Sequence, residues 1–157
     1  MELDSYERFM RAFFFETPDR VPTFDIVEKI ELIRLFGGAG PPEKVIPRTY
    51  RRLGIDATRW PIFMPPTEDK IEVAHRVGFH NAGTGRGFII CEKPFKYKIS
   101  ARECTEWLID SPFKTIEDLY TVKYELMSED EILEEYVPAI EKYIKLYRRE
   151  GVVYVGC

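Results

Sequence analysis

The chain has 157 residues, of which 45% are hydrophobic, 14% aromatic and 32% charged, and these proportions are typical of a folded domain rather than a disordered one. One compact domain of this length buries roughly 70% of the surface of its unfolded chain, so a single domain over 1–157 is expected. The 27 acidic and 23 basic residues give a net charge of −4, which argues against nucleic acid and anionic membranes as partners.

The sequence also predicts where the protein works. Its apolar stretches are far shorter than the roughly 20 residues that a membrane helix needs, and it lacks the pattern of a secretory signal, so a cytoplasmic protein is expected. The three cysteines, Cys91, Cys104 and Cys157, include no Cys-x-x-Cys pair. Free thiols are therefore predicted, rather than a disulfide framework or a zinc knuckle.

Predicted elements near the amino terminus alternate between helix and strand. Asp4 followed by Glu7 predicts a capping box for a helix over 5–15. The proline at position 18 ends that helix, and a short strand over 21–27 follows. A helical pattern over 30–36 then ends in a cluster of glycines, which do not form a phosphate loop because they close a helix instead of opening one.

The next elements complete a second helix and strand and lead to a predicted insertion. A proline-opened helix spans 42–53 and is followed by a strand over 57–63. A polar helix is predicted over 67–77. A glycine-rich loop then leads to an antiparallel hairpin over 88–99, whose turn falls at 92–94.

The carboxyl-terminal part predicts a long helix and a buried strand. A short helix over 115–119 precedes a capping box formed by Ser128 and Glu131, and helical spacing continues to 148. The run 152–157 is continuously apolar, as in a strand buried on both faces of a parallel sheet.

Strands separated by helices predict an α/β fold, either a barrel or a doubly wound sheet. A parallel strand that is buried on both faces needs neighbours and covering helices on both sides, and a complete barrel needs roughly 250 residues. The expectation is therefore a chain truncated after its third barrel strand, or one half of a split protein.

Several short segments, taken in order, resemble the N-terminal part of the uroporphyrinogen decarboxylase superfamily, which includes cobalamin-dependent (corrinoid) methyltransferases. The segments are Ser-Tyr-Glu-Arg-Phe-Met-Arg-Ala-Phe at 5–13, Pro-Asp-Arg-Val-Pro at 18–22, Leu-Gly-Ile-Asp-Ala at 53–57, and Asp-Ser-Pro-Phe with Ile-Glu-Asp-Leu at 110–119. The resemblance implies the N-terminal portion of a (β/α)8 TIM barrel, with strands at about 22–27, 57–63 and 152–157 and a β-hairpin inserted after the second.

The resemblance also implies where chemistry occurs, namely at the carboxyl ends of the strands. In the decarboxylase branch, an arginine motif follows the first strand and a catalytic aspartate ends the second. This sequence has Asp25 and Glu28 at the first place and Phe63 at the second. Because a substrate rich in carboxylates needs guanidinium partners, the resemblance favours the methyltransferase branch over true uroporphyrinogen decarboxylation.

Four residues are predicted to bind substrate, and catalytic residues remain unassigned. The four are Asp25, Glu28, Phe63 and His80. For the two acidic residues, the alternative is a solvated helix N-terminus. Asp56 is interpreted as a cap or turn residue. No metal site is predicted within this chain because His80 and the cysteines are too widely spaced, while zinc and a corrinoid are implied by the resemblance only.

Two functions stay open. One is the N-terminal fragment of a corrinoid-dependent methyltransferase, whose partners are a small-molecule substrate or a corrinoid protein. The other is a non-catalytic remnant or subunit that needs a second chain to complete the barrel. In either case a homo-oligomer or a complementing chain is expected, because the terminal apolar strand at 152–155 would expose apolar surface.

Overall fold

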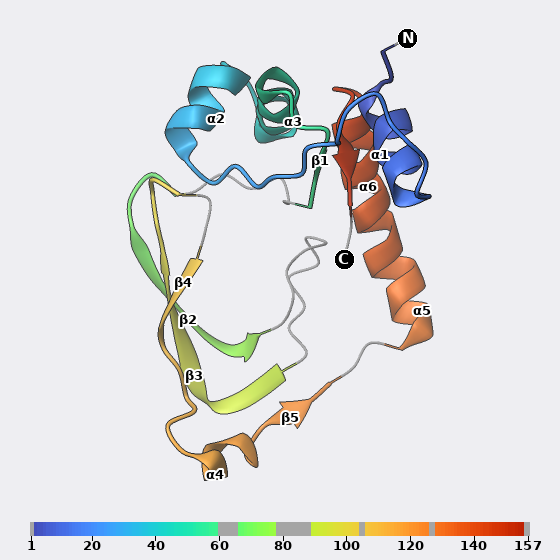
Figure 1. Cartoon of the computed structure of the whole chain (residues 1–157). Coiled ribbons are helices and arrows are strands. Elements are labelled where there is room, and N and C mark those ends of the chain that lie inside the picture. The colour runs from blue at the N-terminus through green and yellow to red at the C-terminus, as the bar shows by residue number, and fades with distance from the viewer. Residues whose placement is uncertain (1, 60–65, 78–88, 104–105, 126–127, 156–157) are drawn as a thin grey trace. The chain divides into compact units, whose positions relative to one another are not determined.

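The computed structural model describes residues 2–59, 66–77, 89–103, 106–125 and 128–155. The chain divides into two compact units (Figure 1). The first unit joins residues 1–64 to residues 140–157, and the second unit comprises residues 65–139.

The predicted capping box starts the first helix, α1 (Ser5–Phe13). The Asp4 carboxylate accepts a hydrogen bond from the backbone N–H of Glu7 at 2.7 Å, and the Glu7 carboxylate accepts one from the N–H of Asp4 at 3.2 Å. The helix is two residues shorter than predicted, because the backbone of Phe15 is left-handed, with φ at 59°. Of its described side chains only that of Arg8 is buried, so the phenylalanines near its end do not enter a core.

The helices α2 (Ile30–Gly37) and α3 (Pro42–Leu53) confirm two predictions and pack against each other (Figure 1). Their close approach depends on Gly37, where a Cβ atom would lie 2.5 Å from the carbonyl oxygen of Val45. A glycine is therefore required here by packing and not by the turn that follows.

A parallel sheet forms in the order that the sequence predicts. The strand β1 (Ala57–Thr58) pairs in parallel with β6 (Val153–Tyr154), and Phe24 makes an isolated parallel bridge to Ala57. The predicted strand over 21–27 is nevertheless wrong beyond that bridge. Pro22 cannot donate a ladder hydrogen bond, and the N–H of Thr23 is taken by the Asp56 side chain.

The core of the first unit contains tyrosines from helices α3 and α6 (Val137–Arg148) and from β6. Tyr50 and Tyr147 are fully buried and meet edge to face at 5.8 Å, while Tyr147 stacks on Tyr154 at 5.4 Å. The Tyr50 hydroxyl accepts a hydrogen bond from the N–H of Val27 at 2.9 Å. Tyr147 therefore joins α6 to both α3 and β6 within this core.

The second unit is an antiparallel sheet, and here two predictions are wrong. The strands are ordered β2–β3–β4, and β5 pairs with the beginning of β3. They are β2 (Lys70–Val77), β3 (Ile89–Ile99), β4 (Glu106–Asp110) and β5 (Lys123–Tyr124). The segment predicted as a helix over 67–77 is therefore largely a strand. The predicted hairpin is instead the single strand β3, which pairs with other segments.

The register of β3 explains how its supposed turn residues fit into a strand. Between the pairs Ala74 to Phe95 and Arg76 to Ile90, a single residue of β2 faces the four residues 91–94. Pro94 falls in this bulge, where no ladder hydrogen bond is required of it. Phe95, Ile99 and Cys91 are buried and form the core beneath the sheet.

Helical structure also follows the prediction over 115–119 and from 128 onward. The short helix is α4 (Ile116–Leu119), and the long one consists of α5 (Glu129–Glu131), the π-helical stretch η1 (Ile132–Tyr136) and α6. The π-helical stretch ends two residues before Pro138, whose missing N–H cannot bond back to the carbonyl of Glu134 as a regular α-helix requires. None of the helices that the structure describes is both long and apolar enough to cross a membrane.

The fold class is therefore mixed α/β. Over the described residues, the parallel sheet of the first unit consists of β1, β6 and the bridge at Phe24, and it does not close on itself.

Candidate functional site

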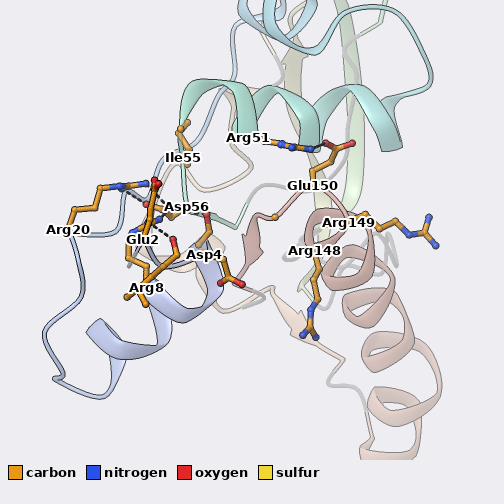
Figure 2. Close-up of a pocket in the computed structure, with 14 residues that line it drawn as sticks. Glu2, Asp4, Arg8, Arg20, Arg51, Ile55, Asp56, Arg148, Arg149 and Glu150 are labelled. Carbon is orange, nitrogen blue, oxygen red and sulfur yellow. Dashed lines mark hydrogen bonds and ion pairs between the residues drawn. The ribbon is translucent and has the colours of Figure 1, made fainter.

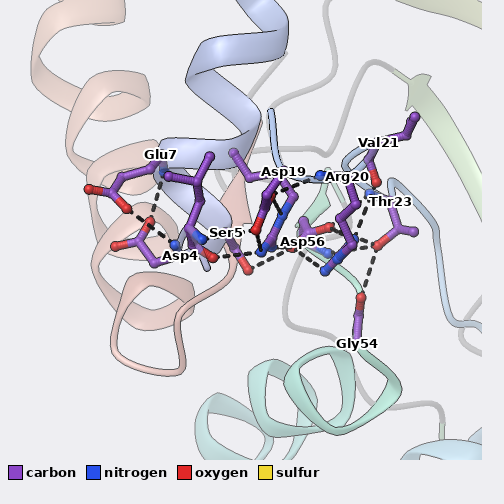
Figure 3. Close-up of polar contacts among 11 residues, drawn as sticks. Asp4, Ser5, Glu7, Asp19, Arg20, Val21, Thr23, Gly54 and Asp56 are labelled. Atoms are coloured by element: carbon purple, nitrogen blue, oxygen red, sulfur yellow. Dashed lines mark hydrogen bonds and ion pairs between the residues drawn. The ribbon is translucent and has the colours of Figure 1, made fainter. Parts of the chain in front are cut away.

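A buried carboxylate organises the amino ends of the parallel strands. Asp56 stands directly before β1, and its side chain is only 1% exposed. Its Oδ1 atom accepts hydrogen bonds from Arg8 at 2.6 Å and Ser5 at 2.9 Å, and its Oδ2 atom accepts from Arg20 at 2.6 Å. We call Ser5, Arg8, Asp19, Arg20, Thr23 and Asp56 the Asp56 cluster (Figure 3).

Arg8 connects the two carboxylates of the cluster. Its side chain is 4% exposed. The Nε and Nη2 atoms hold Asp19 at 2.7 and 3.0 Å, the bidentate geometry that guanidinium groups favour with carboxylates. The Nη1 atom contacts Asp56. Two arginines therefore balance two aspartates, so the cluster is electrically neutral overall.

The contacts keep both carboxylates ionised. Burial alone would raise the pKa of Asp56, but hydrogen bonds from the N–H of Thr23 and from Arg20, Ser5 and Arg8 outweigh it and lower the pKa to about 2. Hydrogen bonding to Arg8 holds the pKa of Asp19 well below its usual range. The same bond to Asp19 raises the pKa of Arg8. Groups with such pKa values carry fixed charges at neutral pH and do not exchange protons during a reaction.

A pocket of about 700 Å³ opens beside this cluster (Figure 2). Its charged lining residues include Arg51 and Glu150, whose side chains lie 3.4 Å apart. The guanidinium of Arg148 lies 5.4 Å from the centre of the Tyr6 ring. The complete charged lining comprises Arg8, Arg20, Arg51, Arg148, Arg149, Glu2, Asp4, Asp56 and Glu150. Positive and negative groups nearly cancel, so the pocket has no strong preference for an anion.

The position of the cluster argues for a structural role. It lies at the amino ends of parallel strands, whereas ligands of α/β sheets and barrels bind at the carboxyl ends. In the first unit, residues that follow the paired positions at the carboxyl ends are Asp25, Arg59 and Val155. We call this the carboxyl edge.

Of the predicted substrate-binding residues, two can be placed. Asp25 is exposed at the carboxyl edge, its N–H donates to the carbonyl of Ala57 at 3.3 Å, and its carboxylate accepts from the N–H of Ile26 at 2.7 Å. Glu28 is partly exposed, between Asp25 and α2. The predictions for Phe63 and His80 fall outside the described residues.

Sequence reasoning misses the role of Asp56 and does not single out Arg59. The sequence favours a turn role for Asp56 because the partners of its carboxylate are remote, with Arg8 lying 48 residues away. One available signal is the position of an aspartate immediately before a buried strand, together with the arginines in the segments 5–13 and 18–22. Arg59 is exposed directly after β1 and is a guanidinium available at the carboxyl edge.

The remaining chemical candidates do not form a site. Cys91 is a buried free thiol whose pKa is raised by burial, which disfavours the reactive thiolate. His75 is exposed, and its Nδ1 atom lies 3.3 Å from the carbonyl oxygen of Cys91. Across the part of the chain that the structure describes, no three His, Cys, Asp or Glu side chains gather as metal ligands do.

Comparisons with protein-family models, with curated proteins and with solved structures find no match to this chain.

Proposed function

We propose that this chain supplies the first three strands of a (β/α)8 barrel of the uroporphyrinogen decarboxylase superfamily, and that the barrel is a corrinoid-dependent methyltransferase. The observation that carries the proposal is the Asp56 cluster. Ser5 and Arg8, Asp19 and Arg20, and Asp56 come from the segments 5–13, 18–22 and 53–57 that carry the resemblance, and all meet at the amino ends of the strands. These contacts give the short segments a shared structural role, because together they surround the Asp56 carboxylate.

The order of the parallel positions also supports the proposal. Phe24 bridges to β1 and β1 pairs with β6, so the parallel positions follow the order of the chain. Helices lie in both connections, and the connection from β1 to β6 also contains the sheet of the second unit. Parallel neighbours need crossover connections, and helices in those connections are the repeating feature of a (β/α)8 barrel. Five further strands would be supplied by additional polypeptide.

The carboxyl edge fits methyl transfer better than porphyrinogen decarboxylation. Asp25 is an exposed carboxylate there, with Glu28 following it, and Arg59 is a single guanidinium. A substrate that bears many carboxylates would meet negative charge at the first strand. A methyl acceptor such as a thiol could instead give its proton to the Asp25 carboxylate. The resulting thiolate would then attack the methyl carbon of a methylated corrinoid substrate; the carbon–cobalt bond would break and its electron pair would stay on the corrinoid, which leaves as cob(I)alamin.

The metal implied by the resemblance is not assigned to this chain. The described residues contain no group of ligands that fits zinc, so no step of the proposed reaction uses a metal bound to them. The corrinoid enters as a substrate that a partner protein presents.

A methyl-transfer assay on the native protein tests the proposal. The protein is isolated from its host through a tag at its own locus, its intact mass is measured, and it is supplied with methylcobalamin and a thiol. Transfer is followed by the cobalamin spectrum and by the mass of the methylated thiol. We expect transfer by the native assembly, no transfer by the 157-residue chain alone, and no decarboxylation of uroporphyrinogen by either.

A matched pair of variants locates the chemistry. Asp25→Asn in the native assembly should slow transfer at least tenfold, which is typical for the loss of a general base. Asp69→Asn removes an exposed carboxylate of the second unit and should leave the rate unchanged. Formation of coproporphyrinogen would contradict the proposal. A native assembly that transfers no methyl group would favour the non-catalytic subunit instead.

A further inference from the structure

Three helices of the first unit end with the same pair of hydrogen bonds, but α1 differs in the residue at the critical position. In each, an N–H beyond the last helical turn bonds back five positions, and the preceding N–H bonds back three positions to form a smaller ring. The bonds are Glu16 to Arg11 and Phe15 to Ala12 for α1, Ile55 to Tyr50 and Gly54 to Arg51 for α3, and Val152 to Tyr147 and Gly151 to Arg148 for α6. This is the Schellman motif.

The motif requires a left-handed backbone at one residue. That residue is Gly54 in α3, with φ at 71°, and Gly151 in α6, with φ at 73°. In α1 it is Phe15, with φ at 59°, and no other non-glycine residue among those described has a positive φ. A phenylalanine strains this conformation because its Cβ crowds the carbonyl oxygen.

Packing of the Phe15 side chain does not offset this strain among the described residues. The Phe15 side chain is 98% exposed, so it has almost no packing partner in that part of the chain. Strained residues persist where another interaction favours them, and they cluster at functional surfaces. An external contact is therefore the physical reason to keep a phenylalanine where the other two helices have glycine.

The two preceding residues extend the apolar surface. Phe13 and Phe14 are 64% and 61% exposed, and their rings meet edge to face at 5.4 Å. With about 200 Å² for each aromatic side chain, Phe13, Phe14 and Phe15 leave roughly 450 Å² exposed. We call these three residues the phenylalanine patch.

We propose that the phenylalanine patch is where a second copy of this chain docks. A stable interface buries about 800 Å² on each partner, of which roughly 500 Å² is apolar, and the patch supplies nearly all of that apolar share. A two-fold pairing of identical patches also avoids an apolar surface facing a polar one. This surface is separate from the proposed carboxyl edge, so it does not depend on the proposed function.

The charges beside the patch favour a protein copy over a lipid surface. Arg11 and Glu16 flank the phenylalanines in sequence, and both are exposed. Opposite charges allow the arginine of one copy to face the glutamate of the other. Binding to an anionic membrane would require an excess of basic residues beside the patch. The segment 7–16 has no such excess, because Glu7 and Glu16 balance Arg8 and Arg11, and Arg8 is held in the Asp56 cluster.

Phe15→Gly tests the proposal because it should change association and stability in opposite directions. Sedimentation and light scattering over a concentration series measure the dimer dissociation constant, and thermal unfolding is measured at a concentration below that constant. We expect the wild-type chain to form dimers and Phe15→Gly to weaken them at least tenfold. The variant monomer should melt roughly 3 °C higher, because glycine relieves the left-handed strain.

Controls distinguish the phenylalanine patch from the remaining apolar surfaces of the chain and from a membrane-binding role. Leu35→Ser removes an apolar side chain of α2 that is 71% exposed and should leave the dissociation constant unchanged. A wild-type chain that stays monomeric, or a Phe15→Gly chain that associates as before, would overturn the proposal; the latter would point to the terminal strand instead. The proposal would also be overturned, in favour of a membrane, by the following result: the wild-type chain does not self-associate but sediments with neutral or anionic phospholipid vesicles, and Phe15→Gly abolishes that sedimentation.

Discussion

Ion pairs serve different purposes in the two units of the chain. In the first unit, Arg8 and Asp56 are almost fully buried and hydrogen-bonded to each other, and Asp56 also accepts hydrogen bonds from Arg20 and from the N–H of Thr23. In the second unit, the pairs Lys98–Asp69 and Lys96–Asp110 lie with about half of each side chain exposed. Water screens the exposed pairs, so each contributes little to the free energy of unfolding.

Buried and exposed ion pairs differ less in the attraction between their charges than in the stability that is lost when one partner is removed. A buried charge without its partner has neither water nor an opposite charge to stabilise it, and removing one partner of a buried pair is therefore strongly destabilising. An exposed charge is simply hydrated. Substitutions that remove a single charge should thus lower the free energy of unfolding much more in the first unit than in the second.

Asp56→Asn should have the largest effect. The amide keeps the size of the side chain but removes the negative charge that faces Arg8 and Arg20. We expect a loss of about 3 to 5 kcal/mol in the free energy of unfolding, measured by urea denaturation followed by circular dichroism. Hydrogen exchange should increase in α1, β1 and β6.

The matched control for that variant is Asp69→Asn in the second unit. Asp69 accepts a hydrogen bond from the N–H of Ala101 at 2.8 Å and pairs with the exposed Lys98, and we expect a loss below about 1 kcal/mol. Equal losses for the two variants would mean that burial does not determine the strength of these pairs.

Acid should destabilise the first unit through the Asp56 carboxylate. Its pKa is about 2 in the folded chain, below the ordinary value of 3.8. A carboxylate with a lowered pKa stabilises the fold above its unfolded pKa, and this contribution is lost as the pH falls toward the folded pKa. Between pH 5 and pH 2 the free energy of unfolding should fall by about 2 kcal/mol from this group. Urea titrations at several pH values measure the fall, and a flat profile would contradict it.

Gly37→Ala should have an intermediate effect, in which helix propensity and packing act in opposite directions. Alanine in place of glycine favours a helix by roughly 1 kcal/mol. Its Cβ atom, however, would lie 2.5 Å from the Val45 carbonyl oxygen, a backbone atom that cannot simply rotate away. Overpacking of this kind costs about 1 to 3 kcal/mol, so we expect a net loss of about 1 kcal/mol in urea denaturation. A stabilised variant would show that α2 and α3 can separate freely.

The same contrast between units governs what could be predicted from the sequence. Several helix boundaries in the first unit follow local signals: the capping box of Asp4 and Glu7 starts α1, and α3 spans 42–53 as predicted and ends before the left-handed Gly54. The Asp56 cluster could not be predicted in the same way, because its members are brought together only when the whole unit folds.

The second unit resists prediction because its strands depend on distant partners. The segment 70–77 alternates apolar and polar residues at Ile71 and Val73, but its charged residues also suit a helix. Its partner in the sheet is the segment 89–99, and only that pairing decides between a strand and a helix. Pro94 likewise suggests a turn when the segment is considered alone. The bulge that accommodates this proline forms only when β2 and β3 pair.

Lys98→Met should have the smallest effect and tests the exposed pairs most directly. Lys98 faces Ile71 on one neighbouring strand and Trp107 on the other, so a methionine can contact both with a side chain of similar length. The lost ion pair with Asp69 is worth less than about 1 kcal/mol, and the new apolar contacts offset part of it. We expect a net change within about 0.5 kcal/mol in urea denaturation. A larger loss would show that the exposed pairs stabilise the second unit, and the contrast with the Asp56 cluster would then rest on something other than burial.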